Sequence, residues 1–479
     1  MELTLSPGSS LNSRPFWTSN AELFISRRCL LTAKRLTIEL ADVVTPECLR
    51  RIALEVLKLD KVDWQHINAL AITGPSSAFT YYIDTVVVDD QTSADIAHTL
   101  QYFKRNLRNI VDLNLAYSNV GSMGSYICSC FGAIYGGQLQ AHRASLTVPF
   151  TFVEFSRNLK VLELTLDSSA ARILPSVCGE TLVVLKLERV PLNLAWHYFC
   201  YDVFARSIVF RRLAILHLGY EASGMEITKE EIQSKSISGA HYYDQLCFPA
   251  LRQLSITNCT PDCDLLYADI PFPELKVVRL SGHFDNIRHC NRLKLSWVGD
   301  LSIEIHSSEP DETADVYKVT NHFFSGVCIG RTASLDFNTE RFPLDPELIR
   351  WANLTRLAVV VVDYVTVCKL IALLPSLAEL SVFTLKLGVS LGGELDMAES
   401  LYSSADPLLA WGERLATIRI LEFSEHCPSA VAVGSVQDLI LHATSLAYLY
   451  IPEPLGPYLI EFVDKKKSRH AHLGKISIF

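Results

Sequence analysis

A serine between two glycines is the sequence feature that comes closest to a catalytic motif. The segment GVSLG, residues 388–392, follows an apolar run. In serine hydrolases, the nucleophilic serine lies in such a G-x-S-x-G motif, on the turn between a buried strand and a helix. Asp396 and His426 complete the hydrolase order of serine, acid and histidine. However, the motif fixes few positions, and the Gly-Glu pair at 393–394 begins a helix poorly. We therefore interpret the segment as a loop between strands, and a serine hydrolase using Ser390 is the remote alternative.

A second group of residues carries side chains that bind metals. A structural zinc site needs four ligands at compact spacing such as Cys-x₂-Cys, whereas Cys259 and Cys263 are separated by three residues. Strands in a sheet lie about 4.8 Å apart, so Cys259 and His283 on neighbouring strands could approach each other. We interpret the group as buried thiols and turn histidines, and we expect no metal and no cofactor. Its members are Cys259, Cys263, His283, His289 and Cys290.

The elements that must position these residues follow one strand pattern. Aliphatic side chains stand at the first, fourth and sixth places of short segments, as in LRQLSITNC at residues 251–259. Copies that begin at 251, 275 and 298 are 23 or 24 residues apart, and longer intervals elsewhere need insertions. Chance matches would not recur at one spacing, so the pattern predicts a repeat array. The copies are Leu159/Leu162/Leu164, Leu182/Leu185/Leu187, Leu213/Leu216/Leu218, Leu251/Leu254/Ile256, Leu275/Val278/Leu280, Val298/Leu301/Ile303, Leu354/Leu357/Val359, Leu377/Leu380/Val382, Leu415/Ile418/Ile420, Leu446/Leu449/Ile451, Leu473/Ile476/Ile478 and the looser Thr332/Leu335/Phe337.

The N-terminal part of the chain follows the same pattern with helices between the strands. Between its first two strands, Thr45 and Pro46 suit a helix start, and residues 49–57 place apolar side chains at helical spacing. A second amphipathic helix is predicted at 94–107. The sequence therefore predicts an N-terminal extension at 1–32, poorly ordered, and a single array over 33–479 with a parallel sheet inside and helices outside. The strand copies here are Ala33/Leu36/Ile38, Ile67/Leu70/Ile72 and Ile110/Leu113/Leu115.

The copies resemble leucine-rich repeats, L-x-x-L-x-L-x-x-N/C, over about residues 33–479. The resemblance implies an α/β solenoid with irregular repeats, a curved parallel sheet inside and helices and loops outside. Variable repeats without an asparagine ladder are similar to the repeat arms of fungal F-box proteins, which hold a substrate for a ubiquitin ligase. No F-box is recognisable in residues 1–30, which implies a missing or degenerate one. At the ninth place, where regular repeats hold Asn or Cys, only Cys259 matches. The residues there are Asp167, Val190, Glu221, Cys259, His283, Val362 and Phe423.

Composition narrows the class of protein. The net charge is −9 and 20% of residues are charged, so no basic field favours a nucleic-acid partner. Thirteen cysteines are spread singly along the chain, an odd number that fits reduced thiols better than a disulfide framework. Residues 1–30 have neither the basic start nor the apolar stretch of a signal peptide. We expect an intracellular protein, cytoplasmic or nuclear.

Two further segments bear on location. Residues 357–374 are apolar over nearly a membrane span, but Asp363 and Lys369 lie inside it and would be costly in a bilayer. A strand at 354–362 followed by a helix at 364–374 explains the segment better, and we expect no membrane partner. The basic run KKKSRHAH, 465–472, suits a solvated loop, with a nuclear import signal or anion patch as the alternative.

The pattern also predicts a binding surface. Strand side chains alternate, so the third, fifth and seventh places should share the concave side of the sheet. We expect a non-catalytic module that binds another protein through this side, with charged residues setting orientation and flanking apolar residues adding contact. A solvated face without a partner, or binding through insertion loops at 221–245 and 306–318, are the alternatives. The residues are Glu163, Lys186, His217 and Arg279, flanked by Val184, Ile215 and Val277.

The last predicted strand ends at Phe479. Because an uncapped repeat exposes an apolar flank, we expect either that the loop at 452–464 covers Phe479 in part or that the strand edge is used in assembly.

Overall fold

The computed structural model places its strands and helices in separate described segments along the chain. The structure describes residues 2–5, 33–39, 46–57, 64–73, 89–115, 122–146, 158–166, 180–190, 209–220, 248–259, 272–283, 297–306, 328–336, 351–386, 415–423, 437, 445–451, 455–466 and 475–478. These residues fall into two compact units. The N-terminal unit comprises Met1–Arg252 and Asp262–Glu274, and the C-terminal unit comprises Gln253–Pro261 and Leu275–Phe479.

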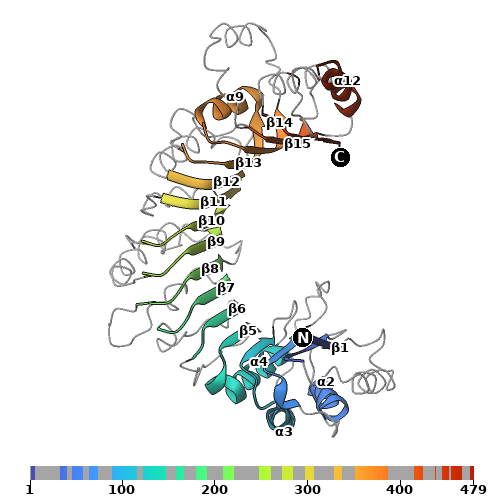
Figure 1. The fold of residues 1–479 in the computed structure, drawn as a ribbon. Helices are drawn as coiled ribbons and strands as arrows, with labels where there is room; N and C mark the ends of the chain where they lie inside the picture. Colours follow the sequence, from blue (N-terminus) through green and yellow to red (C-terminus); the bar gives the residue numbers. More distant parts are fainter. Residues whose placement is uncertain are drawn as a thin grey trace. The chain divides into compact units, whose positions relative to one another are not determined.

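The N-terminal unit contains eight described strands that pair in parallel, each with the next along the chain (Figure 1). Helices α2, α3 and α4 follow β2, β3 and β4 in turn; α2 and α3 confirm the predicted strand–helix copies, whereas α4 was not predicted. The bounds are β1 Glu2–Leu5, β2 Arg35–Glu39, α2 Pro46–Arg51, η2 (π-helical) Ile52–Val56, η3 (3₁₀) Trp64–His66, β3 Ala69–Thr73, α3 Asp90–Asn106, β4 Asp112–Leu115, α4 Ser122–Tyr135, η4 (3₁₀) Gly136–Gln138, β5 Ala141–Leu146, β6 Val161–Leu166, β7 Val184–Val190 and β8 Ile215–Tyr220.

The C-terminal unit contains nine described strands, which also pair in parallel in chain order. The predicted parallel α/β arrangement of solenoid-like order is therefore confirmed within each unit. The bounds are β9 Gln253–Cys259, β10 Val277–His283, β11 Trp297–His306, β12 Cys328–Asp336, β13 Arg356–Asp363, α9 Tyr364–Leu373, β14 Glu379–Lys386, β15 Thr417–Phe423, β16 Tyr448–Ile451, α12 Gly456–Lys466 and β17 Lys475–Ile478.

The predicted core places are buried in both units. First-, fourth- and sixth-place side chains of the predicted copies are at most 4% exposed wherever their burial is described, apart from the copy at Thr332. Leu162 in β6 and Leu254 in β9 are completely buried. Side chains at even places of a strand share one face, so this burial confirms the assigned register for these copies.

One core position was not visible from the strand pattern. A buried residue stands three places before the first leucine, and its carbonyl accepts the N–H of that first-place residue, as in Leu354 N–H to Trp351 O at 2.9 Å. This bond closes a tight turn before each of these strands and, except at Gly136, buries an aromatic or aliphatic side chain in it. The same bond is made at Trp64, Gly136, Phe210, Phe248, Trp351 and Leu374.

A copy missed in the sequence lies between residues 139 and 144. Its strand β5 pairs His142 with Leu162 and Ala144 with Leu164, so histidine and alanine occupy the fourth and sixth core places. His142 is completely buried, and burial lowers its pKa to about 4, with the neighbouring Arg143 charge acting in the same direction. The copy escaped prediction because neither residue is a large aliphatic.

The register predicted at Thr332 was wrong by two residues. Leu301 pairs with Ala333, and Ile303 pairs with Leu335, so Ala333 and Leu335 hold the fourth and sixth places. Thr332 instead pairs with Asp300 at the third place. A register shift, in which β12 has one residue more than β11, displaced the pattern.

Segments at the edges of the array gave mixed outcomes. The predicted strand and helix within 357–374 are confirmed as β13 and α9, and in the part of the chain that the structure describes no helix is long and apolar enough to cross a membrane. The predicted loop at 452–464 was wrong, because helix α12 begins at Gly456. Residues 2–5 of the N-terminal extension form β1, which pairs with β2. The extent of the extension, most of which lies outside the described residues, and the single array stay predictions.

Candidate protein-binding face of the N-terminal unit

The fifth-place side chains of the N-terminal unit form one row across neighbouring strands. Register pairs Arg143 with Glu163, Glu163 with Lys186, and Lys186 with His217. All four are half-buried, on the side of the sheet opposite the aliphatic core. We call this side, which carries the third, fifth and seventh places, the strand face. Three of the predicted site residues, Glu163, Lys186 and His217, are thus brought together.

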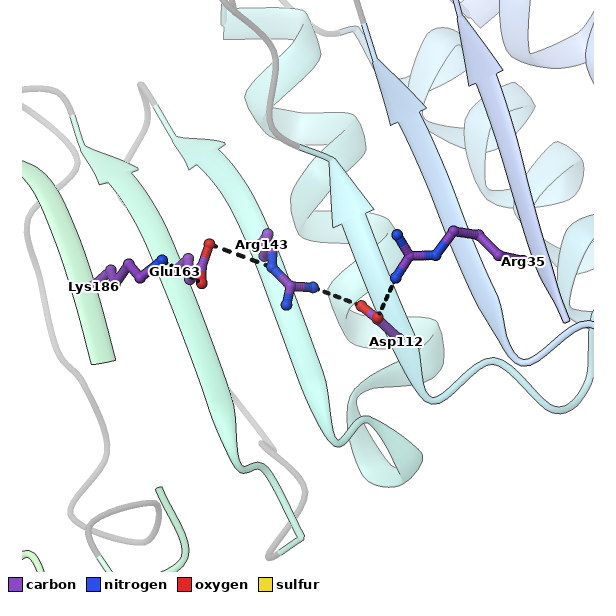
Figure 2. A network of polar contacts seen from close by, with 5 residues as sticks. All are labelled: Arg35, Asp112, Arg143, Glu163 and Lys186. Atoms are coloured by element: carbon purple, nitrogen blue, oxygen red, sulfur yellow. Dashed lines mark hydrogen bonds and ion pairs between the residues drawn. The ribbon is translucent and has the colours of Figure 1, made fainter. Parts of the chain in front are cut away.

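Ion pairs link Arg143, Glu163 and Lys186 of this row to further residues in a chain of alternating charge, as Figure 2 shows. Arg143 lies between two carboxylates, 2.7 Å from Asp112 and 3.3 Å from Glu163. Beyond them, Asp112 contacts Arg35 at 3.1 Å, and Glu163 contacts Lys186 at 3.0 Å. We call these five residues the charge chain. Each partly exposed pair contributes about 0–1 kcal/mol to stability, so its main effect is to hold the side chains in fixed positions.

A further ion pair continues the row on the next strands. His217 Nε2 lies 2.6 Å from Glu188 Oε1, a seventh-place carboxylate on β7. This contact is an ion pair when the imidazole is protonated and a hydrogen bond when Nε2 carries the proton. Sequence reasoning that followed the fifth place alone did not find Glu188.

Apolar side chains lie beside the charge chain on the same face. The third places of β5–β8 hold Ala141, Val161, Val184 and Ile215, which are register neighbours. All four are half-buried, so part of each apolar surface remains in water. The predicted residues Val184 and Ile215 therefore adjoin each other and flank Lys186 and His217. An apolar strip beside oriented charges has the mixed character of a protein-binding surface.

The remaining predicted residues lie in the C-terminal unit. Arg279 on β10 is exposed and pairs in register with Ser255 and Ser302. Val277, at the third place of β10, is half-buried and stands opposite Gln253 on one side and Asp300 on the other. These two residues are neighbours on one strand, but they belong to a different compact unit from the charge chain.

Asp300 is the centre of a separate polar cluster on β11. Arg331 approaches it through two hydrogen bonds of 3.0 and 2.7 Å, and the Thr332 hydroxyl also donates to it. Partial burial opposes ionisation of Asp300, but these bonds and the charges of Arg331 and Arg279 outweigh it, so its pKa is lowered. The cluster is a surface ion-pair site between neighbouring strands.

The two chemical motifs of the sequence lie wholly or partly outside the described residues. The segment 388–392, with Asp396 and His426, is outside them, as are Cys263, His289 and Cys290. A register shift near the end of β9 places Cys259 opposite Gly282, so Cys259 and His283 are not register partners. Within the described segments, no group of three or more histidine, cysteine or acidic residues could hold a metal.

Sequence reasoning missed the first three residues of the charge chain. Arg143 was missed because its strand has no leucine-like core residues, as described above for His142. Asp112 and Arg35 stand at the third places of copies that were recognised, and tracing third as well as fifth places would have found them.

Comparison with known proteins adds no relative to these observations. No protein-family model matches the chain, and no curated protein matches it.

Proposed function

We propose that this chain is a non-catalytic protein-interaction module built on irregular leucine-rich repeats, and that it binds a partner protein through the strand face of its N-terminal unit. The observation that carries the proposal is the charge chain beside a half-exposed apolar strip. Binding then needs little side-chain ordering, because ion pairs already hold Asp112, Arg143 and Glu163 in place.

The chemistry of the strand face favours a protein partner over a small substrate. Each charge of the chain is offset by its neighbour, so the surface has direction but little net field. Such alternation orients a partner with the complementary order of charges, while Val161, Val184 and Ile215 add apolar contact. Nucleophiles paired with a base, which catalysis by a serine or cysteine would need, are not part of this surface.

The test is a reversal of charge on the face. Lys186→Glu should abolish capture of the wild-type partners from a native lysate, because the change places like charge against the partner. Lys160→Glu is the matched control, since Lys160 is an exposed second-place residue off the strand face. It should leave capture unchanged.

Retention of the partners by the variant would contradict the proposal. If Lys186→Glu folds normally and retains the same partners as wild type, the binding site lies elsewhere, and the insertion loops become the alternative. Recovery of ubiquitin-ligase subunits with the wild-type chain alone would assign it the role of a substrate receptor.

A further inference from the structure

The C-terminal unit carries a separate cluster of exposed apolar side chains. Among the described residues, the large exposed hydrophobics on strands are Phe383, Leu421 and Tyr448, and each belongs to β14, β15 or β16. They are 49%, 40% and 47% exposed, respectively. The other described examples, such as Leu373 on α9, lie in helical segments. Exposed apolar side chains scattered singly are ordinary, whereas a cluster on three consecutive strands marks a contact surface.

The register brings these side chains onto one face. Pairs on either side of them (Val382 with Ile420, and Thr384 with Glu422) set Phe383 opposite Leu421 at the seventh place. Tyr448 stands at the third place of β16. Neighbouring parallel strands are about 4.8 Å apart, so Phe383 and Leu421 form a continuous apolar contact area.

An unpaired cation lies between the two ends of this area. The Arg419 guanidinium lies 4.8 Å from the centre of the Tyr450 ring, its register partner at the fifth place. Arg419 is exposed, and no ion pair to it occurs among the described residues. Glu379 on the neighbouring strand β14, the register partner of Thr417, is bound to Arg356 at 2.9 Å. A guanidinium held against an aromatic ring offers its remaining donors to a carboxylate.

We propose that the face formed by Phe383, Leu421, Arg419, Tyr448 and Tyr450, the aromatic patch, binds a segment of another protein that carries a carboxylate beside aromatic or aliphatic side chains. The carboxylate pairs with Arg419, and the apolar side chains cover Phe383 and Leu421. A second copy that used the same patch fits poorly, because none of the five patch residues is a carboxylate that could pair with Arg419. This inference deepens the proposed protein-binding function and rests on it, but it names a different surface and the chemistry of its ligand.

Selection from a displayed library of random linear peptides, with the full-length chain as bait, tests the patch directly. Recovered peptides should be enriched in Asp or Glu next to Phe, Tyr, Trp or Leu. The same selection on Arg419→Glu should recover peptides with Lys or Arg in place of the acids, because the charge of the site is inverted.

Binding of the selected peptides identifies the surface. Phe383→Thr combined with Leu421→Thr should weaken binding about tenfold or more, as loss of a contact worth about 1.4 kcal/mol or more does. Threonine keeps the preference for strand structure, so the variant should fold. Leu373→Gln, which removes an exposed apolar side chain from α9, is the matched control and should bind normally.

Three outcomes would overturn the proposal: no peptide is recovered, the peptides show no acidic preference, or they bind the double threonine variant as well as wild type. These outcomes leave the N-terminal face untouched, because capture by Lys186→Glu reads that face separately. Acidic peptides that bind the patch, together with a chain that captures no partner through the charge chain, would instead place the whole binding function on the C-terminal unit.

Discussion

The two units bury the same places of the strand pattern but distribute polar side chains differently on the strand face. On β5–β7 the fifth place is charged (Arg143, Glu163, Lys186) and the third place is apolar. On β11–β14 the charges stand at the third place instead: the fifth place holds Ser302, Ser334, Ala358 and Ser381, while the third holds Asp300, Thr332, Arg356 and Glu379.

This difference separates what folding requires from what it leaves free. The fourth and sixth places contact the core and are aliphatic in nearly every described copy, so they carry the fold in both units. The third, fifth and seventh places face away from the core, and here strands β5–β7 and β11–β14 carry different patterns. A charge chain in one unit and an aromatic patch in the other therefore suggest two ligands of different chemistry.

The largest expected effect concerns the shared core. Leu162→Ala in the N-terminal unit and Leu254→Ala in the C-terminal unit should each lower the free energy of unfolding by about 2–5 kcal/mol, since both side chains are fully buried. Chemical denaturation followed by circular dichroism measures both. An unchanged midpoint for either variant would show that the two units do not share one core pattern.

A smaller effect should distinguish the units by pH. The pKa of His142 is about 4 in the folded N-terminal unit and ordinary, near 6.5, when unfolded. A lowered pKa means that stability is fully present above about pH 6.5 and is lost as the pH falls toward 4, because the unfolded chain then binds a proton that the folded chain does not. The loss is on the order of 3 kcal/mol.

The variant His142→Leu isolates this effect from other groups. It places a leucine at the fourth core place, as in the neighbouring Leu162, and should remove most of the acid sensitivity measured by denaturation between pH 7 and 4.5. If wild type and His142→Leu lose stability equally over this range, His142 is not the buried titrating group.

The smallest effect concerns the charge chain. Asp112→Asn removes the carboxylate between Arg35 and Arg143 and should cost about 1 kcal/mol at low salt, with the loss shrinking in 1 M NaCl. Glu422→Gln in the C-terminal unit, an exposed carboxylate with no ion pair among the described residues, should cost less than about 0.5 kcal/mol. Equal, salt-independent costs for the two would mean that the charge chain contributes no more than isolated surface charges.

Periodic aliphatic residues made most of the strand array predictable. Leu159, Leu162 and Leu164 specify a strand and its buried face without further information. The prediction failed where a core place is not aliphatic, as at His142, and where an extra residue shifts the register, as at Ala333. In both cases the place of the residue is set by pairing with the neighbouring strands. That pairing accepts a small or polar residue at a core place, and the local sequence gives no sign of it.

The candidate site was predictable in part for the same reason. Glu163, Lys186 and His217 follow from alternation along recognised strands. Their partners Asp112 and Glu188 stand at other places on other strands, and the ion pairs depend on register and on long side chains reaching across it. The turn residue three places before the first leucine of a copy, as at Phe248, is a signal that the sequence contains and that would improve such predictions.

Site-specific photo-crosslinking in a native lysate tests the central claim most directly, that the strand face of the N-terminal unit binds a protein. A benzophenone side chain at Thr165, a half-buried seventh-place residue on β6, lies on this face, and one at Arg212, in the exposed turn before β8, lies off it. We predict that Thr165 crosslinks to a discrete protein, that Lys186→Glu abolishes this crosslink, and that Arg212 gives none. Crosslinks to the same protein from Arg212 but not from Thr165 would contradict it.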